Sequence, residues 1–149
     1  MKVFVVRLNP DTRECISYSK YPTTREYEKI HSESPMDGFH EAVNFLPEDG
    51  IIRGYLPPKH SRSLRDGNPF CLITITAKTA KIGGDKIIGI QAGCIYKGET
   101  ERMNLSHVSN APNLKYHYSC QEALSLLFSK PISNAREIIL GENLSWMAC

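Results

Sequence analysis

The sequence predicts one α+β domain, a mixed β-barrel flanked by short helices, spanning residues 1–149. This length is usual for a single domain, and 41% of the residues are hydrophobic, which is enough to form a core. Runs rich in β-branched residues recur between turn sequences, and no linker rich in Gly and Ser divides the chain. The predicted helices lie between and after the strands, which argues against a parallel sheet of alternating βαβ units.

The N-terminal third predicts two strands followed by two helices. Lys2–Leu8 is the first strand, Asn9–Asp11 is the turn that closes it, and Cys15–Ser19 is the second strand. Helices are expected over residues 23–30 and 34–46, because each begins with a capping sequence. The second also carries apolar residues at helical spacing.

The middle of the chain contains the clearest strands. Ile51–Leu56 is predicted to be a strand, and Pro57–Gly67 a long basic loop. Phe70–Lys78 and Ile87–Tyr96 follow as two strands joined by a hairpin turn at Gly83-Gly84. Glycine inside a strand marks a bulge or a close approach by another backbone, and two glycines interrupt the second of these strands, Gly89 and Gly93.

The C-terminal part predicts a short strand and then a helix. Lys115–Tyr118 has the aromatic content of a strand. Ser119 and Glu122 form a capping box in front of the apolar run Ala123–Phe128, which predicts a helix there. Another turn or two of helix is expected over residues 134–140.

The composition predicts a cytoplasmic protein without membrane contact. No apolar run approaches the ~20 residues of a membrane helix, and the apolar stretch at the N-terminus is too short for a signal peptide. The five cysteines are scattered, with no CxxC and no Cys/His pair at zinc-ligand spacing. We therefore expect reduced thiols and no metal site.

The common motifs of catalysis and cofactor binding are absent from the sequence. It contains no GxSxG elbow, no GxxxxGK[ST] loop and no HExxH. We therefore predict no catalytic residue and no cofactor, and a binding module in preference to an enzyme. A nuclease with a dispersed carboxylate site that includes Asp11 and Glu14 stays open as an alternative, although no Asp/Glu-x-Lys on a following strand completes it.

Positive charge is concentrated in the middle of the chain. Residues 51–118 contain ten Lys and Arg against four Asp and Glu. A segment this basic attracts a polyanion, and an ordinary solvated surface is the alternative reading. Its densest part spans thirteen residues that include prolines, which stiffen a loop and expose its cations to phosphate. The predicted phosphate-binding residues are Arg53, Lys59, His60, Arg62 and Arg65.

Aromatic residues near the ends of the predicted elements indicate a pocket for one base. A ring stacked on an unpaired base contributes about 1–3 kcal/mol, and hydrogen bonds to the base edge add specificity. Asn9 is expected to bind that edge, because of its place in the first turn. A position in the core or in a lid is the alternative for the tryptophan, Trp146. The predicted pocket consists of Asn9, Tyr18, Tyr21, Tyr55 and Trp146.

Residues 1–12, 66–75 and 87–96 together resemble EVE domains of the PUA-like superfamily. They are similar to that family's opening strand and turn, to its Gly-Asp followed by an apolar strand, and to its hydrophobic strand after the hairpin. The basic segment 61–65 lies where the family carries an Arg-containing ligand loop. Leu8-Asn9 departs from the usual Ser-Glu pair, and the family's Asn-x-x-Ala-Arg is not reproduced.

The resemblance implies a PUA-like barrel that recognises nucleic acid, with DNA favoured over RNA, by flipping a modified base into an aromatic pocket. EVE-like domains also serve as specificity modules of modification-dependent restriction endonucleases, so a nuclease domain or subunit is an implied partner. A module on the same barrel that binds a protein or a small ligand stays open as the alternative. In that case the basic loop is incidental.

Overall fold

The computed structural model describes residues 1–8, 41, 43–56, 58–76, 86–102, 115–134 and 145–147, with the backbone alone at Leu8, Pro58–His60, Thr76 and Ser145–Met147. All elements within these ranges are strands or short 3₁₀ turns. In chain order they are β1 (Lys2–Leu8), β2 (Pro47–Glu48), β3 (Ile51–Gly54), η2 (Pro58–Leu64), β4 (Phe70–Thr76), β5 (Ile87–Glu101), β6 (Lys115–Gln121), η3 (Glu122–Leu124), β7 (Ser125–Ile132) and β8 (Ser145–Met147). Among the described residues, no helix combines the length and the apolar character needed to cross a membrane.

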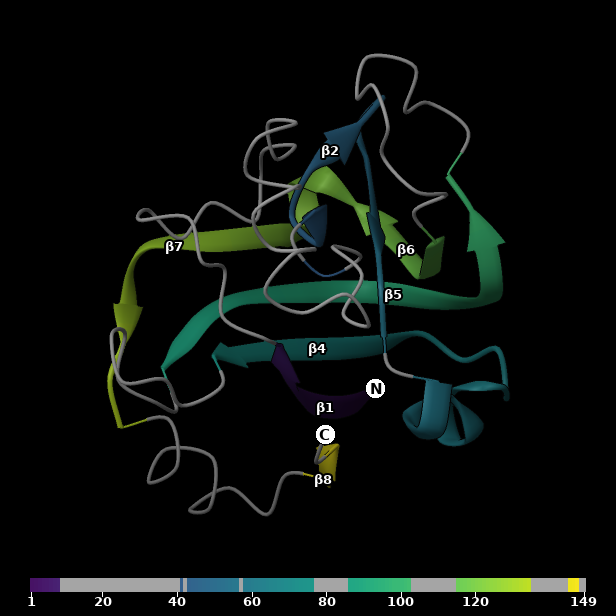
Figure 1. Ribbon diagram of the computed structural model, residues 1–149, viewed down its shortest axis with the longest axis horizontal. Helices are drawn as coiled ribbons and strands as arrows, with labels where there is room; N and C mark the ends of the chain where they lie inside the picture. Colours follow the sequence, from purple (N-terminus) through teal and green to yellow (C-terminus); the bar gives the residue numbers. More distant parts are fainter. Residues whose placement is uncertain are drawn as a thin grey trace, which may run out of the picture.

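Eight strands form one mixed sheet (Figure 1). Their order is β2-β3-β6-β5-β4-β1-β8, and β7 pairs with β5 beside this path. β1 runs parallel to β4 and to β8, whereas the other pairs are antiparallel. The β-rich mixed sheet expected from the sequence is confirmed. The described strands leave this sheet open, so they do not form the closed barrel that was also expected.

β5 is the longest strand and organises the sheet. Its first half is paired with both β4 and β7, and its second half is paired with β6. Ser119 pairs with Ile95 and Ser125 with Gln91, so β6, η3 and β7 follow one another along one edge of β5 (Figure 1). This arrangement carries the sheet around the bend of β5.

The helix predicted over Ala123–Phe128 is wrong. Ser119, its expected cap, lies within β6 and is paired to both β3 and β5. Only Glu122–Leu124 makes a 3₁₀ turn, and the residues after it continue as β7. The hydrogen bonds that β6 and β7 make with β5 therefore override the local capping signal.

The irregular loop predicted over residues 57–67 is also partly wrong, because Pro58–Leu64 forms η2. Ser61 and Leu64 are buried, and Leu64 belongs to the main hydrophobic cluster. Arg62 and Arg65 remain exposed. A 3₁₀ helix repeats every three residues, so Ser61 and Leu64 face the core, whereas Arg62 and Arg65 face solvent.

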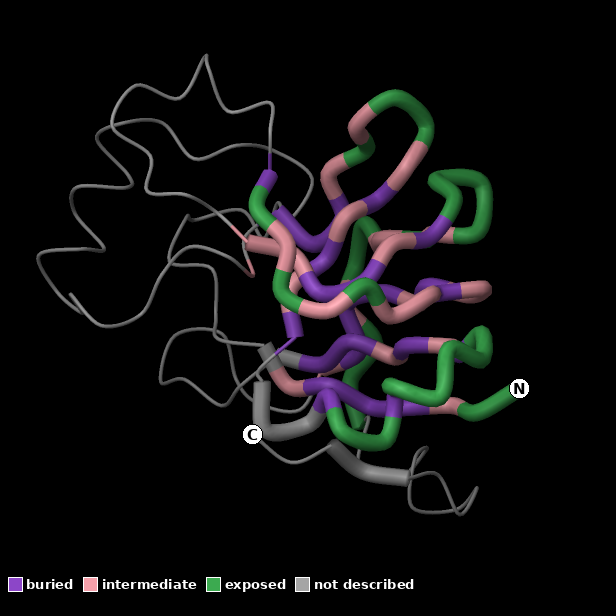
Figure 2. The backbone as a smooth tube through the Cα atoms, turned by 90° about the vertical axis from the view of Figure 1, so that its right-hand side faces the viewer, coloured by how far each residue is buried: buried purple, intermediate pink, exposed green. Residues whose placement is uncertain are grey.

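The core consists of two clusters on opposite faces of the sheet. β4 shows the division, because Phe70 and Leu72 belong to the main cluster while Ile73 and Ile75 belong to the smaller one. Side chains alternate between the two faces of a strand, and apolar residues on both faces identify β4 as a central strand. Figure 2 shows the buried residues within the strands and the exposed ones at the connecting turns.

Three glycines are required by close approaches or by backbone conformation. A Cβ at Gly89 would lie 2.5 Å from Cζ of Phe45 and 2.6 Å from the carbonyl oxygen of Leu126. Gly93 has a φ of 63° at the point where the register between β4 and β5 shifts. The close approach and the bulge that the sequence predicted are both confirmed. A Cβ at Gly54 would overlap the ring of Tyr118.

The other predicted strands that can be compared are confirmed. The first matches β1 at both ends, and those over 51–56, 70–78, 87–96 and 115–118 correspond to β3, β4, β5 and β6. The predicted strand 15–19, the helix 23–30, most of the helix 34–46, most of residues 134–140 and the Gly83-Gly84 turn lie outside the described residues. At the end of the second predicted helix, Asn44 N donates to Glu41 O at 3.1 Å, which is a 3₁₀ bond.

Candidate functional site

The predicted site residues are described to different extents. Asn9, Tyr18 and Tyr21 lie outside the described residues, and so do Asp11 and Glu14 of the alternative carboxylate site. Trp146 lies on β8, and Lys59 and His60 lie on η2, each with its backbone alone described. The side chains that can be placed are those of Arg53, Tyr55, Arg62 and Arg65.

Arg53 is engaged inside the protein. Its Nη1 donates to the backbone carbonyl of Glu48 at 3.2 Å and to Oε2 of the same residue at 3.1 Å. Its side chain is 29% exposed. We therefore leave Arg53 out of the candidate site and assign it to the pairing of β2 with β3.

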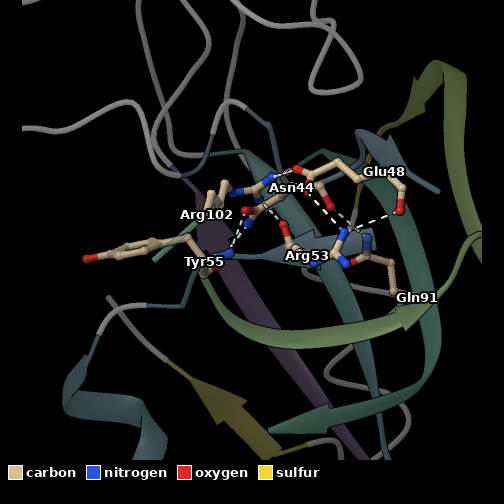
Figure 3. A network of polar contacts seen from close by, with 6 residues as sticks. All are labelled: Asn44, Glu48, Arg53, Tyr55, Gln91 and Arg102. Carbon is tan, nitrogen blue, oxygen red and sulfur yellow. Dashed lines mark hydrogen bonds and ion pairs between the residues drawn. The ribbon is translucent and has the colours of Figure 1, made fainter. Parts of the chain in front are cut away.

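Glu48 also holds a second arginine that the sequence did not single out. Arg102 donates through Nη1 to Oε1 of Glu48 and through Nη2 to the backbone carbonyl of Arg53 (Figure 3). The side chain of Arg102 is 0% exposed and that of Glu48 is 10% exposed. Two arginines thus share one nearly buried carboxylate, which fixes β2, β3 and the end of β5 together.

Tyr55 is held by its backbone. The Asn44 side chain accepts from Tyr55 N at 2.7 Å and donates to Tyr55 O at 2.9 Å, so both peptide groups of this position are satisfied by one amide. The Tyr55 ring points away from the polar network in Figure 3 and is half-buried. This clamp fixes the backbone position from which the ring extends, shortly before η2 begins at Pro58.

The clamp is anchored in the core. Gln91 donates from Nε2 to the carbonyl of Asn44 at 2.8 Å, and the Tyr118 hydroxyl donates to Oε1 of Gln91 at 2.5 Å. Burial raises the pKa of Tyr118 well above its usual value, so the phenol keeps the proton that it donates. A continuous set of hydrogen bonds therefore connects the buried Tyr118 to the emerging Tyr55 backbone.

His117 supports the Tyr55 ring from one side. The two rings meet edge to face, with centroids 4.8 Å apart and planes at 71°. His117 Nδ1 accepts from Leu56 N at 3.3 Å, which leaves the proton of the neutral ring on Nε2. Burial lowers the pKa of His117, and its side chain is 2% exposed. This histidine is therefore a neutral packing partner without access to a ligand.

Beside these rings lies an exposed pair of opposite charges. Lys115 Nζ donates to Oε1 of Glu99, and His117 Nε2 lies 3.9 Å from the other carboxylate oxygen. The Glu99 side chain is 52% exposed and that of Lys115 38% exposed. The carboxylate of Glu99 raises the pKa of Lys115, so this amine is charged at neutral pH.

Arg62 on η2 and Arg65 just after it present positive charge, and both follow Tyr55 within the same connection between β3 and β4. The acid that follows them, Asp66, binds Lys2 Nζ at 2.6 Å and accepts from Asn68 N at 3.1 Å. Its hydrogen bond with Lys2 lowers the pKa of Asp66 to about 2. The nearest carboxylate in sequence is thus engaged by Lys2.

The sequence located part of this site. Tyr55, Arg62 and Arg65 were predicted, whereas Asn44, Glu99 and Lys115 were missed. The alternation of β6 was a usable signal, because it places Lys115 and His117 on one face and Tyr118 on the other. The role of Asn44 had no local signal, since its partner lies eleven residues away.

Among the described residues, no group of three or more His, Cys, Asp or Glu side chains is arranged to hold a metal ion. The comparisons with known proteins give no further assignment. No family model matches the chain, and neither a curated protein nor a solved structure is significantly similar to it.

Proposed function

We propose that this protein binds nucleic acid through a site formed by Tyr55, Arg62 and Arg65, with Lys59 and His60 in the same 3₁₀ turn. The observation that carries the proposal is a half-buried ring that is clamped through its own backbone shortly before η2, with Arg62 exposed on η2 and Arg65 exposed just after it. The ring offers a face for one base, and the arginines offer paired donors for phosphate.

The spacing within η2 supports a row of cations. Lys59 and Arg62 lie three residues apart within η2, and positions three apart align in a 3₁₀ helix. Arg65 follows the end of η2 at the same spacing. Ser61 and Leu64 are buried on the other side and keep the turn in place. A rigid row of positive charges loses less conformational entropy on binding than a flexible loop does.

The similarity to EVE domains supports a finer proposal, namely a PUA-like reader that flips a modified base, with DNA preferred to RNA. Asn9, Tyr18 and Tyr21 would then be the further candidates for the pocket around Tyr55. Trp146 lies on β8, at the opposite end of the strand order from β3, so this pocket would not include it. The protein would act with a nuclease domain or subunit, as the specificity module of a restriction system. Oligonucleotides with and without common base modifications test this part separately.

The main test is a binding titration of labelled single-stranded and duplex oligonucleotides, followed by fluorescence polarisation at several salt concentrations. We expect the affinity for a single strand to fall with salt, with a log–log slope of about 0.7 per phosphate contact. The variant Arg62→Ala/Arg65→Ala should reduce this slope by about 1.4 on the same basis.

The matched control removes two exposed cations elsewhere on the sheet, in Lys97→Ala/Lys130→Ala, and so makes the same change in net charge. This control should keep the wild-type slope to within about half a contact. Equal losses in both variants would indicate a general charge effect and would contradict the assigned site.

A further inference from the structure

We propose that Glu99 and Lys115 read the Watson–Crick edge of the base that stacks on Tyr55, and that this pair selects guanine. The inference rests on the proposed nucleic-acid binding and specifies which base the site takes. It applies equally to a modified guanine that keeps O6, N1–H and the exocyclic amino group.

The geometry places the charged pair beside the stacking ring. His117 connects them, because its ring contacts Tyr55 at a centroid distance of 4.8 Å and its Nε2 lies 3.9 Å from Oε2 of Glu99. Glu99 lies where the register between β5 and β6 shifts, between the pairs Tyr96–Tyr118 and Thr100–Tyr116, so this stretch of β5 passes the part of β6 that holds His117. The ring, the carboxylate and the ammonium therefore border one stretch of surface.

The chemistry of the pair matches guanine better than the other bases. The Watson–Crick edge of guanine presents one acceptor, O6, next to two donors, N1–H and the amino group. A carboxylate accepts two adjacent donors, and an ammonium donates to the neighbouring acceptor. Adenine, cytosine and thymine each present a single donor group on this edge, so they use only part of the carboxylate.

The presence of a carboxylate in a site that binds a polyanion also has to be explained. The Glu99 carboxylate repels phosphate. Lys115 offsets that repulsion, because its ammonium group pairs with the carboxylate. The remaining gain from Glu99 comes from hydrogen bonds to a base, which raise specificity more than affinity. An exposed ion pair contributes little to folding, so we expect Glu99→Gln to keep the fold.

The experiment uses the whole protein and labelled oligothymidines with one central dG, dI, dA, dC or dT. Inosine differs from guanosine only by lacking the amino group, so the comparison of dG with dI isolates one hydrogen bond to the carboxylate. We expect the protein to bind dG about tenfold more tightly than dI. Glu99→Gln should bring this ratio close to one, because an amide has a single acceptor oxygen, while the affinity for oligothymidine is kept or improved.

Glu101→Gln is the matched control, because Glu101 is the next carboxylate on the same strand and is also exposed. It should keep the dG preference. Equal affinity for dG and dI, or a dG preference that survives Glu99→Gln, overturns the inference even where salt-dependent binding is intact. Absence of salt-dependent binding to every oligonucleotide overturns the proposed function as well.

Discussion

The backbone amide of Leu56 donates a hydrogen bond to Nδ1 of His117, at 3.3 Å, inside the protein. This contact selects the neutral imidazole, because a proton on Nδ1 would remove the acceptor and leave the buried amide of Leu56 without a partner. Glu99 on the other side of the ring favours the charged form, but burial dominates and lowers the pKa of His117.

His117 is therefore expected to make the fold less stable as the pH falls. An unfolded histidine takes up a proton near pH 6.5, whereas the folded His117 does so at a lower pH. The free energy of unfolding should decline as the pH drops below about 6.5, until the folded pKa is passed. Urea unfolding at a series of pH values should show a smaller decline for His117→Asn. An NMR titration that places the pKa of His117 above 6.5 would contradict this assignment.

Removing the charge of Glu48 should be costly. Glu48→Gln leaves Arg102, whose side chain is fully buried, without a counter-ion, and such losses cost roughly 3–5 kcal/mol. Urea unfolding measures the change, and the exposed Glu101→Gln serves as the control with little expected effect. A loss below about 1 kcal/mol for Glu48→Gln would mean that water or a rearranged partner reaches Arg102.

A methyl group at residue 54 should disrupt the sheet. Gly54→Ala places a Cβ inside the ring of Tyr118, and overpacking of this kind costs about 3 kcal/mol or more. Gly98→Ala is the control. Gly98 has a φ of 75°, which disfavours alanine, but nothing lies near the position of its Cβ. Its substitution should therefore cost only about 1–2 kcal/mol of stability. In a double-mutant cycle, Tyr118→Leu should recover part of the loss caused by Gly54→Ala. Additive losses would show that the two positions do not interact.

The thiols of Cys94 and Cys120 should resist modification in the folded protein. Both are buried, and the register that pairs Ile95 with Ser119 sets them opposite each other on β5 and β6. The hydrogen bond with Cys120, together with burial, raises the pKa of Cys94, which disfavours its reactive thiolate. The same hydrogen bond lowers the pKa of Cys120, so this thiol is protected by its burial alone. In a variant with Cys15, Cys71 and Cys149 replaced by Ser, a thiol reagent should react slowly until denaturant is added. Rapid reaction of the native variant would contradict the burial of this pair.

Local sequence signals predicted the strands well, because their cause is local. β1 matches its prediction from Lys2 to Leu8. In β5, Gly89 correctly predicted the close approach and Gly93 the bulge. Alternating or continuous apolar runs indicate which faces of a strand are buried, and they can be recognised without knowing the partner strand.

The failures arise where distant partners decide the structure. The capping box of Ser119 and Glu122 suits a helix, yet β5 offers β6 and β7 a full edge of hydrogen bonds. Likewise, no local pattern indicated that Arg53 would be held by Glu48, or that Asn44 would fix the backbone of Tyr55. Contacts of this kind depend on the assembled sheet and have no pattern of their own along the chain.

The fit between Gly54 and Tyr118 bears on how the chain finds its pairing during folding. A slip of β3 by two residues along β6 would keep every side chain on its proper face, so hydrophobic alternation cannot prevent it. Such a slip would set Ile52 in place of Gly54 opposite Tyr118, where the ring leaves no room for a side chain. The fit of Gly54 against Tyr118 thus makes the misaligned pairing of β3 with β6 unfavourable, and it ties the choice of residue at 54 to the presence of a large ring at 118 in any related chain.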